Sequence, residues 1–157
     1  MDRRNILVAG VVASLVIAMW EMIVEAVIPD GAGFFGAPIA IGATIVRDLQ
    51  GSANPIPFNA PALVLGLMGH MMNSVILAAV FGLIVVRSSW SRTATVGAGM
   101  AWGAVVFVGM WFVVTPAVDP LIGNLNGGVF FAGHLMWGAA IGLLWSTTRV
   151  RERALAR

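Results

Sequence analysis

The sequence predicts an all-α fold: a polytopic membrane protein built as a bundle of four transmembrane helices. Composition, four long apolar runs and the placement of the arginines carry this prediction. Of the 157 residues, 59% are apolar and 10% are charged, and the mean hydropathy is +0.93. A soluble domain is about 45–50% apolar and about 25% charged. One small core cannot bury this excess, so we expect lipid to solvate much of the surface.

Four apolar runs are each long enough to cross a hydrocarbon core of about 30 Å, which takes about 20 helical residues. The predicted spans cover residues 6–28, 61–86, 95–115 and 127–148. The alternating segments of about ten residues that mark transmembrane β-strands are absent from the sequence. We expect one membrane domain over residues 1–157. The first run is expected to be retained as a span and not cleaved as a signal peptide, because it carries two glutamates.

The arginines predict the orientation of the spans. Eight of the nine basic residues lie before the first span, between the second and third, or after the fourth. Four spans place these three regions on one side, which the positive-inside rule identifies as the cytoplasm. Both termini are therefore expected to be cytoplasmic, in a bacterial-type inner membrane. The high isoelectric point, about 11.1, reflects this topology and indicates no nucleic-acid partner.

The connection between the first and second spans, residues 29–60, is long and carries an apolar stretch too short to cross a membrane. Pro38 suits the first turn of a helix. Arg47 and Asp48, followed by Gly51, suit its end. We expect an interfacial or re-entrant helix over about residues 36–50.

The two halves of the chain resemble each other. Trp20 and Trp111 each follow a methionine and precede a proline by nine residues, and each half then carries a Gly-His pair in its second span, at His70 and His134. The pattern predicts two tandem helical hairpins related by a pseudo-twofold axis along the membrane normal. The two histidines would then lie at equivalent depth.

Four ionisable residues lie within the predicted spans: Glu21, Glu25, His70 and His134. A charge at such a depth costs about 2.5–3.5 kcal/mol, so each of these residues needs a reason to be there. At 1.5 Å per residue, Glu21 and the histidines lie about 10–13 Å below the outer ends of their spans, with Glu25 one turn above Glu21. We therefore expect the four side chains to converge on one layer in the outer leaflet.

Three interpretations of this layer stay open. A Glu–His hydrogen bond between helices would fix their register. Alternatively, His70 and His134 ligate one haem b axially, or join Glu21 and Glu25 in a transition-metal site. A third interpretation is proton or ion transfer by a small transporter, although the inner halves of the spans carry no ionisable residue to continue a path.

Other residues near this layer are expected to support the site or the packing. Asn73 follows His70 by three residues, and nearby methionines offer thioethers that favour copper(I). Small residues four apart predict close helix–helix contacts. The supporting residues are Asn73, Trp20, Trp111, Met71, Met72 and Met136, and the packing residues are Gly99, Gly103, Gly138 and Gly142.

The sequence gives little indication of enzymatic chemistry. It has no cysteine, which excludes disulfides, thiolate metal sites and cysteine nucleophiles. It also has no Gly-x-Ser-x-Gly turn, His-Glu-x-x-His helix or glycine-rich phosphate loop, so no catalytic residue is assigned.

A first helix of small and β-branched residues that runs to Trp20-Glu21 is followed by Pro29 and by a second span carrying Gly69-His70. In residues 8–29 and 66–82 the chain resembles the YagU-like inner-membrane proteins. The resemblance implies a small inner-membrane protein. It also implies that Glu21 and His70 belong to one site, without indicating what that site does. We expect an accessory or scaffold subunit of a larger membrane complex, in contact with lipid and with a partner protein or a second copy. The main alternative is a protein that binds haem b or a transition metal through His70 and His134.

Overall fold

The computed structural model describes residues 3–86 and 88–155, with side chains placed for residues 4–86 and 88–147. Every regular element in these ranges is helical. The long helices are α1 (Arg3–Val27), α3 (Ala60–Val85), α4 (Arg92–Gly109) and α6 (Gly127–Leu155). The short elements are α2 (Gly36–Gly42), the 3₁₀ turn η1 (Arg47–Leu49), the π-helical turn η2 (Met110–Val114), α5 (Thr115–Ala117) and the 3₁₀ turn η3 (Pro120–Asn124).

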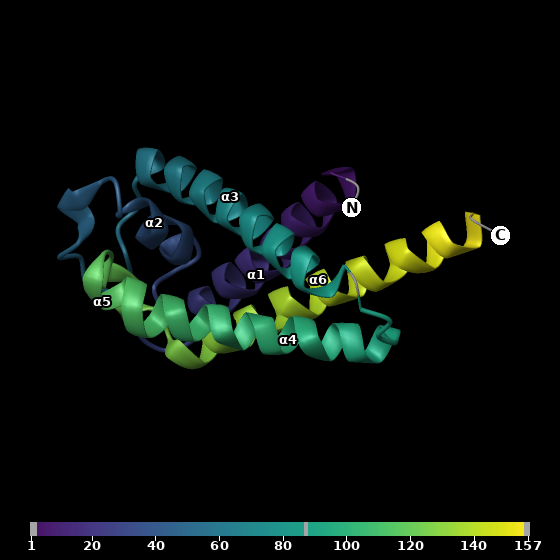
Figure 1. Ribbon diagram of the computed structural model, residues 1–157. Helices are drawn as coiled ribbons and strands as arrows, with labels where there is room; N and C mark the ends of the chain where they lie inside the picture. Colours follow the sequence, from purple (N-terminus) through teal and green to yellow (C-terminus); the bar gives the residue numbers. More distant parts are fainter. Residues whose placement is uncertain (1–2, 87, 156–157) are drawn as a thin grey trace.

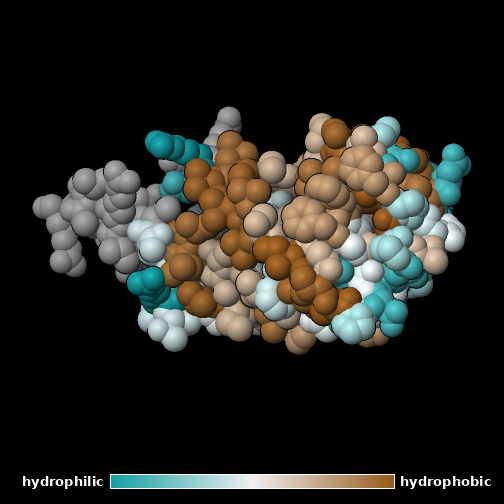
Figure 2. All heavy atoms as spheres, turned by 180° about the vertical axis from the view of Figure 1, so that it is seen from behind, coloured by the Kyte–Doolittle hydropathy of each residue, from teal (hydrophilic) through white to brown (hydrophobic). Residues whose placement is uncertain are grey.

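Four helical stretches are long and apolar enough to cross a membrane. They run over Arg4–Val27, Ala60–Val85, Arg92–Ala117 and Gly127–Thr147. The prediction of an all-helical chain with four such helices is confirmed. Figure 2 shows apolar side chains across the middle of one face, with hydrophilic residues gathered toward its two ends.

Arg87 and Arg157, two of the arginines used to predict orientation, lie outside the described residues, as do the side chains of Arg3, Arg149, Arg151 and Arg153.

Short polar residues begin three of the long helices. The side chains of Asn59 and Ser91 accept hydrogen bonds from the amides of Ala62 and Ala94, at the starts of α3 and α4. Asn126 accepts from the second and third residues of α6. These caps satisfy amides that have no partner inside the helix, so each helix begins where its capping residue stands.

The long helices pack in the order α3, α1, α6, α4. Helices α1 and α6 form the central pair, α3 lies on α1, α4 lies on α6, and α3 and α4 hardly touch (Figure 1). This order differs from the predicted pseudo-twofold arrangement. A twofold axis would exchange α1 with α4 and α3 with α6, so α3 would have to contact α4 as closely as α6 contacts α1.

The predicted helix over residues 36–50 is wrong in its extent. The α-helix α2 has only seven residues, is almost fully buried and packs against α3, so it does not lie on the surface of the protein. Gly42 and Gly66 allow this approach, because a Cβ at either position would collide with the backbone of the other element. The side chain of Gln50 bonds the carbonyl of Ala43 at 3.0 Å, in place of the amide that would continue the helix.

Glycines bring α4 and α6 into backbone contact. Gly99 faces the carbonyl of Gly138, Gly103 faces the carbonyl of His134, and Gly142 lies against Thr95 and Val96. The sequence singles out these four glycines. Between membrane helices such contact supplies the close van der Waals packing that apolar side chains alone do not.

The Gly99→Ala variant tests this interface. The added methyl group would collide with the Gly138 carbonyl, and such overpacking costs about 1–3 kcal/mol. We expect a lower melting temperature in detergent, followed by circular dichroism. Gly97→Ala is the matched control, because a methyl group there would have no neighbour within 4 Å. Equal melting temperatures for the two variants would contradict the account of the interface.

Candidate ligand-binding cleft

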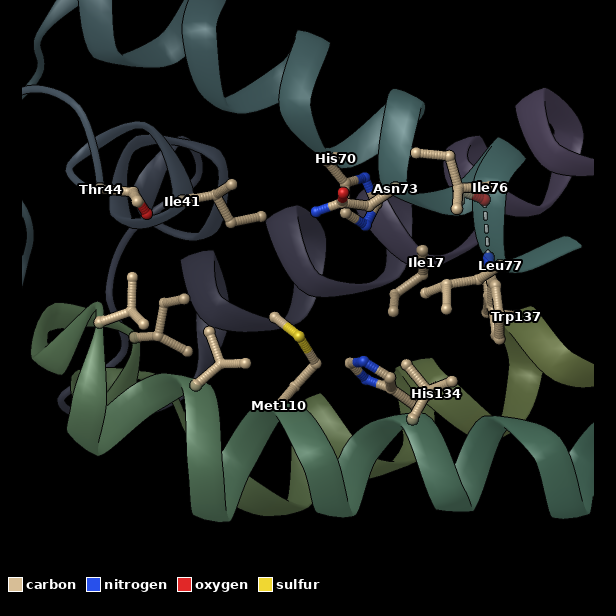
Figure 3. Close-up of a pocket in the computed structure, with 15 residues that line it drawn as sticks. Ile17, Ile41, Thr44, His70, Asn73, Ile76, Leu77, Met110, His134 and Trp137 are labelled. Atoms are coloured by element: carbon tan, nitrogen blue, oxygen red, sulfur yellow. Dashed lines mark hydrogen bonds between the residues drawn. The ribbon is translucent and has the colours of Figure 1, made fainter. Parts of the chain in front are cut away.

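A cleft of about 390 Å³ separates α3 from α4 (Figure 3). Ile17 of α1 and Trp137 of α6 form part of its floor, and Ile41 of α2 closes it at the end that carries the loops. Half of the other lining residues are aliphatic, and they include Leu77 of α3 and Val106 of α4. The cleft exists because α3 and α4 pack on different helices of the central pair.

His70 of α3 and His134 of α6 line this cleft from opposite walls (Figure 3). The Nδ1 atom of His70 lies 3.1 Å from the hydroxyl of Ser14, and that of His134 lies 2.8 Å from the carbonyl of Phe130. Neither Nε2 atom has a hydrogen-bond partner among the described residues, and neither is completely buried. Each imidazole is thus oriented by a contact at Nδ1, and its Nε2 atom stays available to a ligand.

A hydrogen-bond chain holds the floor of the cleft. The indole of Trp137 donates to the hydroxyl of Ser74 at 2.7 Å, and that hydroxyl donates to the carbonyl of Gly10, also at 2.7 Å. The chain links α6, α3 and α1 just below the two histidines. Asn73, predicted as a supporting residue, lines the same cleft.

The carboxylates do not join the histidines. Glu21 is 3% exposed, lies beside Gly133 between α1 and α6, and is not among the residues that line the cleft. Its Oε1 atom is buried and has no hydrogen-bond partner in the part of the chain that the structure describes. The lining of the cleft therefore includes both histidines and neither glutamate, and among the described residues the four side chains form no group able to hold a metal ion. That the four lie in one layer of the outer leaflet stays a prediction.

Glu25 holds the loops together. Its Oε2 atom accepts a hydrogen bond from the amide of Ala32 at 2.9 Å, and its Oε1 atom accepts one from the amide of Asn126 at 2.7 Å. The side chain is 2% exposed. Both carboxylate oxygens are occupied, which explains a buried acid at this depth.

The remaining predicted residues have structural surroundings. Trp20 donates to the carbonyl of Val129 at 2.9 Å, and Trp111 stacks on Phe107 with 6.0 Å between ring centroids. Several methionines are exposed and so form no thioether group around the histidines: Met71, Met72 and Met136. Among the residues that the structure describes, no three His, Cys, Asp or Glu side chains form a group able to hold a metal ion.

Sequence reasoning missed Asp119, which is fully buried between α5 and η3. Its carboxylate accepts hydrogen bonds from Thr44 at 2.5 Å and from Gln50 at 2.6 Å. The side chain of Arg47 donates to the carbonyl of Val118 at 2.6 Å. These bonds join the two loops at one end of the cleft, and a single acid in a short apolar loop was the only signal in the sequence.

Comparison with known proteins finds no matching family model, no matching curated protein and no matching solved structure. The resemblance to YagU-like proteins therefore stays an expectation.

The role of Glu25 can be tested with Glu25→Gln. An amide offers only one acceptor, so one buried amide hydrogen loses its partner, at a cost of about 1–3 kcal/mol. We expect a lower melting temperature in detergent. Asp48→Asn, which makes the same chemical change at an exposed position, is the control and should melt like the parent. A Glu25→Gln protein as stable as the control would show that these two hydrogen bonds contribute little.

Proposed function

We propose that this chain is a small multi-pass membrane protein that binds a lipophilic small molecule in the cleft between α3 and α4. One observation carries the proposal: an apolar cavity holds two histidines, each with a free ring nitrogen, between two helices that hardly touch. In a bilayer, lipid lies beside the gap between those helices. A ligand dissolved in the membrane would then reach the cleft laterally.

The orientation follows from the positive-inside rule. Arg4 and Arg92 lie in the first turns of α1 and α4. These two turns lie at the same end of the bundle (Figure 1), and we place that end in the cytoplasm of a cell with a bacterial-type inner membrane. The loops tied together by Glu25 and Asp119 then face the periplasm. The cleft lies beneath them.

The lining of the cleft defines the chemistry of its ligand. Aliphatic walls suit an apolar body, whereas a polar group needs a partner because leaving it unpaired in an apolar site is costly. His70, Asn73 and His134 offer such partners. Ligand sites commonly combine apolar walls with a few polar groups, in cavities of about 300–1,000 Å³.

Photolabelling tests the proposed access from lipid. We expect an apolar aryl diazirine, added to the protein in nanodiscs, to label Ile17, which lines the cleft and is 2% exposed. Val106→Trp should fill the cleft and sharply reduce this labelling. Val105→Trp is the matched control, because Val105 is 60% exposed and does not line the cleft. Peptide mass spectrometry gives the labelled positions.

Ile23, 48% exposed on the same helix, reports labelling from the surrounding lipid and should be labelled equally in all three proteins. Labelling at Ile23 without labelling at Ile17 in the parent protein would refute the proposed cleft.

A second function, an accessory subunit of a larger membrane complex, is supported by the exposure of α4. In an apolar stretch of 18 residues within the Arg92–Ala117 span, only 11% of the residues are buried within the described part of the chain. Such a surface offers apolar contact area to a partner helix as well as to lipid.

The mass of the purified particle tests this second function. A subunit extracted in mild detergent should have a protein mass well above the 16.5 kDa of one chain, measured by light scattering with correction for detergent. A monodisperse particle with the mass of one chain would contradict the subunit role without affecting the ligand cleft.

A further inference from the structure

The two imidazoles of the cleft are held as metal ligands commonly are, by a hydrogen bond at the ring nitrogen that does not bind the metal. Resting on the proposed function, we propose that the ligand of the cleft is a metalloporphyrin of the haem b class. His70 and His134 would be its two axial ligands, each through Nε2. The tautomer of each ring, the supply of other ligands and the lining of the cleft support this assignment.

The tautomer of His134 follows from its hydrogen bond. A carbonyl oxygen only accepts, so the 2.8 Å contact with Phe130 requires the proton on Nδ1. In the neutral imidazole Nε2 then carries a lone pair, the form in which histidine binds metals. The ring packs against Phe130, with 4.4 Å between centroids, which further restricts its rotation.

His70 is compatible with the same arrangement. Ser14 is 2% exposed, and its hydroxyl lies 3.1 Å from Nδ1 of His70. A hydroxyl accepts as well as donates, so it can take the Nδ1 proton and leave the Nε2 lone pair free. The two histidines come from α3 and α6, and their side chains face the cleft between them (Figure 3).

The supply of ligands favours a porphyrin over a bare ion. The structure offers two imidazoles but no third His, Cys, Asp or Glu beside them in the described residues. Glu25 is occupied by the amides of two loops, and Glu21 does not line the cleft. The other donors in the lining include the thioether of Met110 and the amide of Asn73, which are neutral. A metal that brings further ligands with it, as the iron of haem does with four porphyrin nitrogens, fits this set better than a bare ion.

The lining of the cleft suits the faces of a macrocycle. Aliphatic residues from six elements line the cleft around the two histidines: Ile17, Ile41, Leu77, Val106, Val114 and Ile122. Because α3 and α4 hardly touch, a flat ligand wider than the cavity can extend between them toward lipid.

Haemin titrated into the purified full-length chain in detergent tests the proposal. We expect one haemin per chain and a low-spin six-coordinate spectrum, in both optical absorbance and electron paramagnetic resonance. His70→Ala and His134→Ala should each give a five-coordinate high-spin form. Ser14→Ala should retain six-coordination but bind haemin about 10–100-fold more weakly, as the loss of such an orienting bond does at other metal sites.

Met136→Ala is the control, because Met136 lies two residues from His134 and is exposed. Circular dichroism and gel filtration identify any variant that fails to fold, and His134→Gln then serves as a second substitution. A spectrum that is unchanged when both histidines are replaced overturns the haem inference.

The diazirine experiment separates failure of the inference from failure of the proposed function. Labelling of Ile17 without low-spin haemin would refute only the porphyrin, whereas absence of both would refute the ligand cleft itself.

Discussion

Backbone contact between α4 and α6 is the constraint on which the rest of the structure depends. At four positions glycine leaves no side chain to separate these helices, and α4 therefore packs closely against α6. On the other side of the bundle, α3 packs against α1, where Gly10 lies against the backbone of Val75. Helices in lipid gain little from hydrophobic burial and associate where close packing is possible. Each outer helix thus has one close partner among the long helices, and the space between α3 and α4 is the consequence.

The polar residues of the loops give this open arrangement a rigid end. Glu25 bonds the amides of Ala32 and Asn126, and Asp119 bonds Thr44 and Gln50, so each acid joins the long loop to the second half of the chain. Hydrogen bonds to charged acceptors are among the stronger ones. They hold α2 and η3 over one end of the cleft, where Ile41 and Ile122 line it. The loops that carry α2 and η3 thereby form part of the wall of the site.

Much of the fold could be predicted because its signals are local. Apolar runs long enough to span a bilayer identified the four long helices, and the spacing of Gly99, Gly103, Gly138 and Gly142 identified residues of one interface. The packing order could not be predicted, because a repeat of tryptophan, proline and histidine does not specify which helices become neighbours. The partners of Glu25 were equally hidden. They are main-chain amides 7 and 101 residues away, and a main-chain amide has no residue-type signature in a sequence.

Structural and functional polar residues of the bundle differ in whether their donors and acceptors already have partners within the protein. Ser74, Trp137 and Glu25 meet protein partners that account for their burial. Glu21 has a buried oxygen without a partner among the described residues, but the side chain does not line the cleft. Of the four ionisable residues, His70 and His134 line a cavity large enough for a second molecule and each keeps one ring nitrogen without a partner among the described residues. The depth predicted from the sequence made all four ionisable residues look equivalent. The two that can bind a ligand are distinguished by a ring nitrogen without a partner and by their position at the cleft.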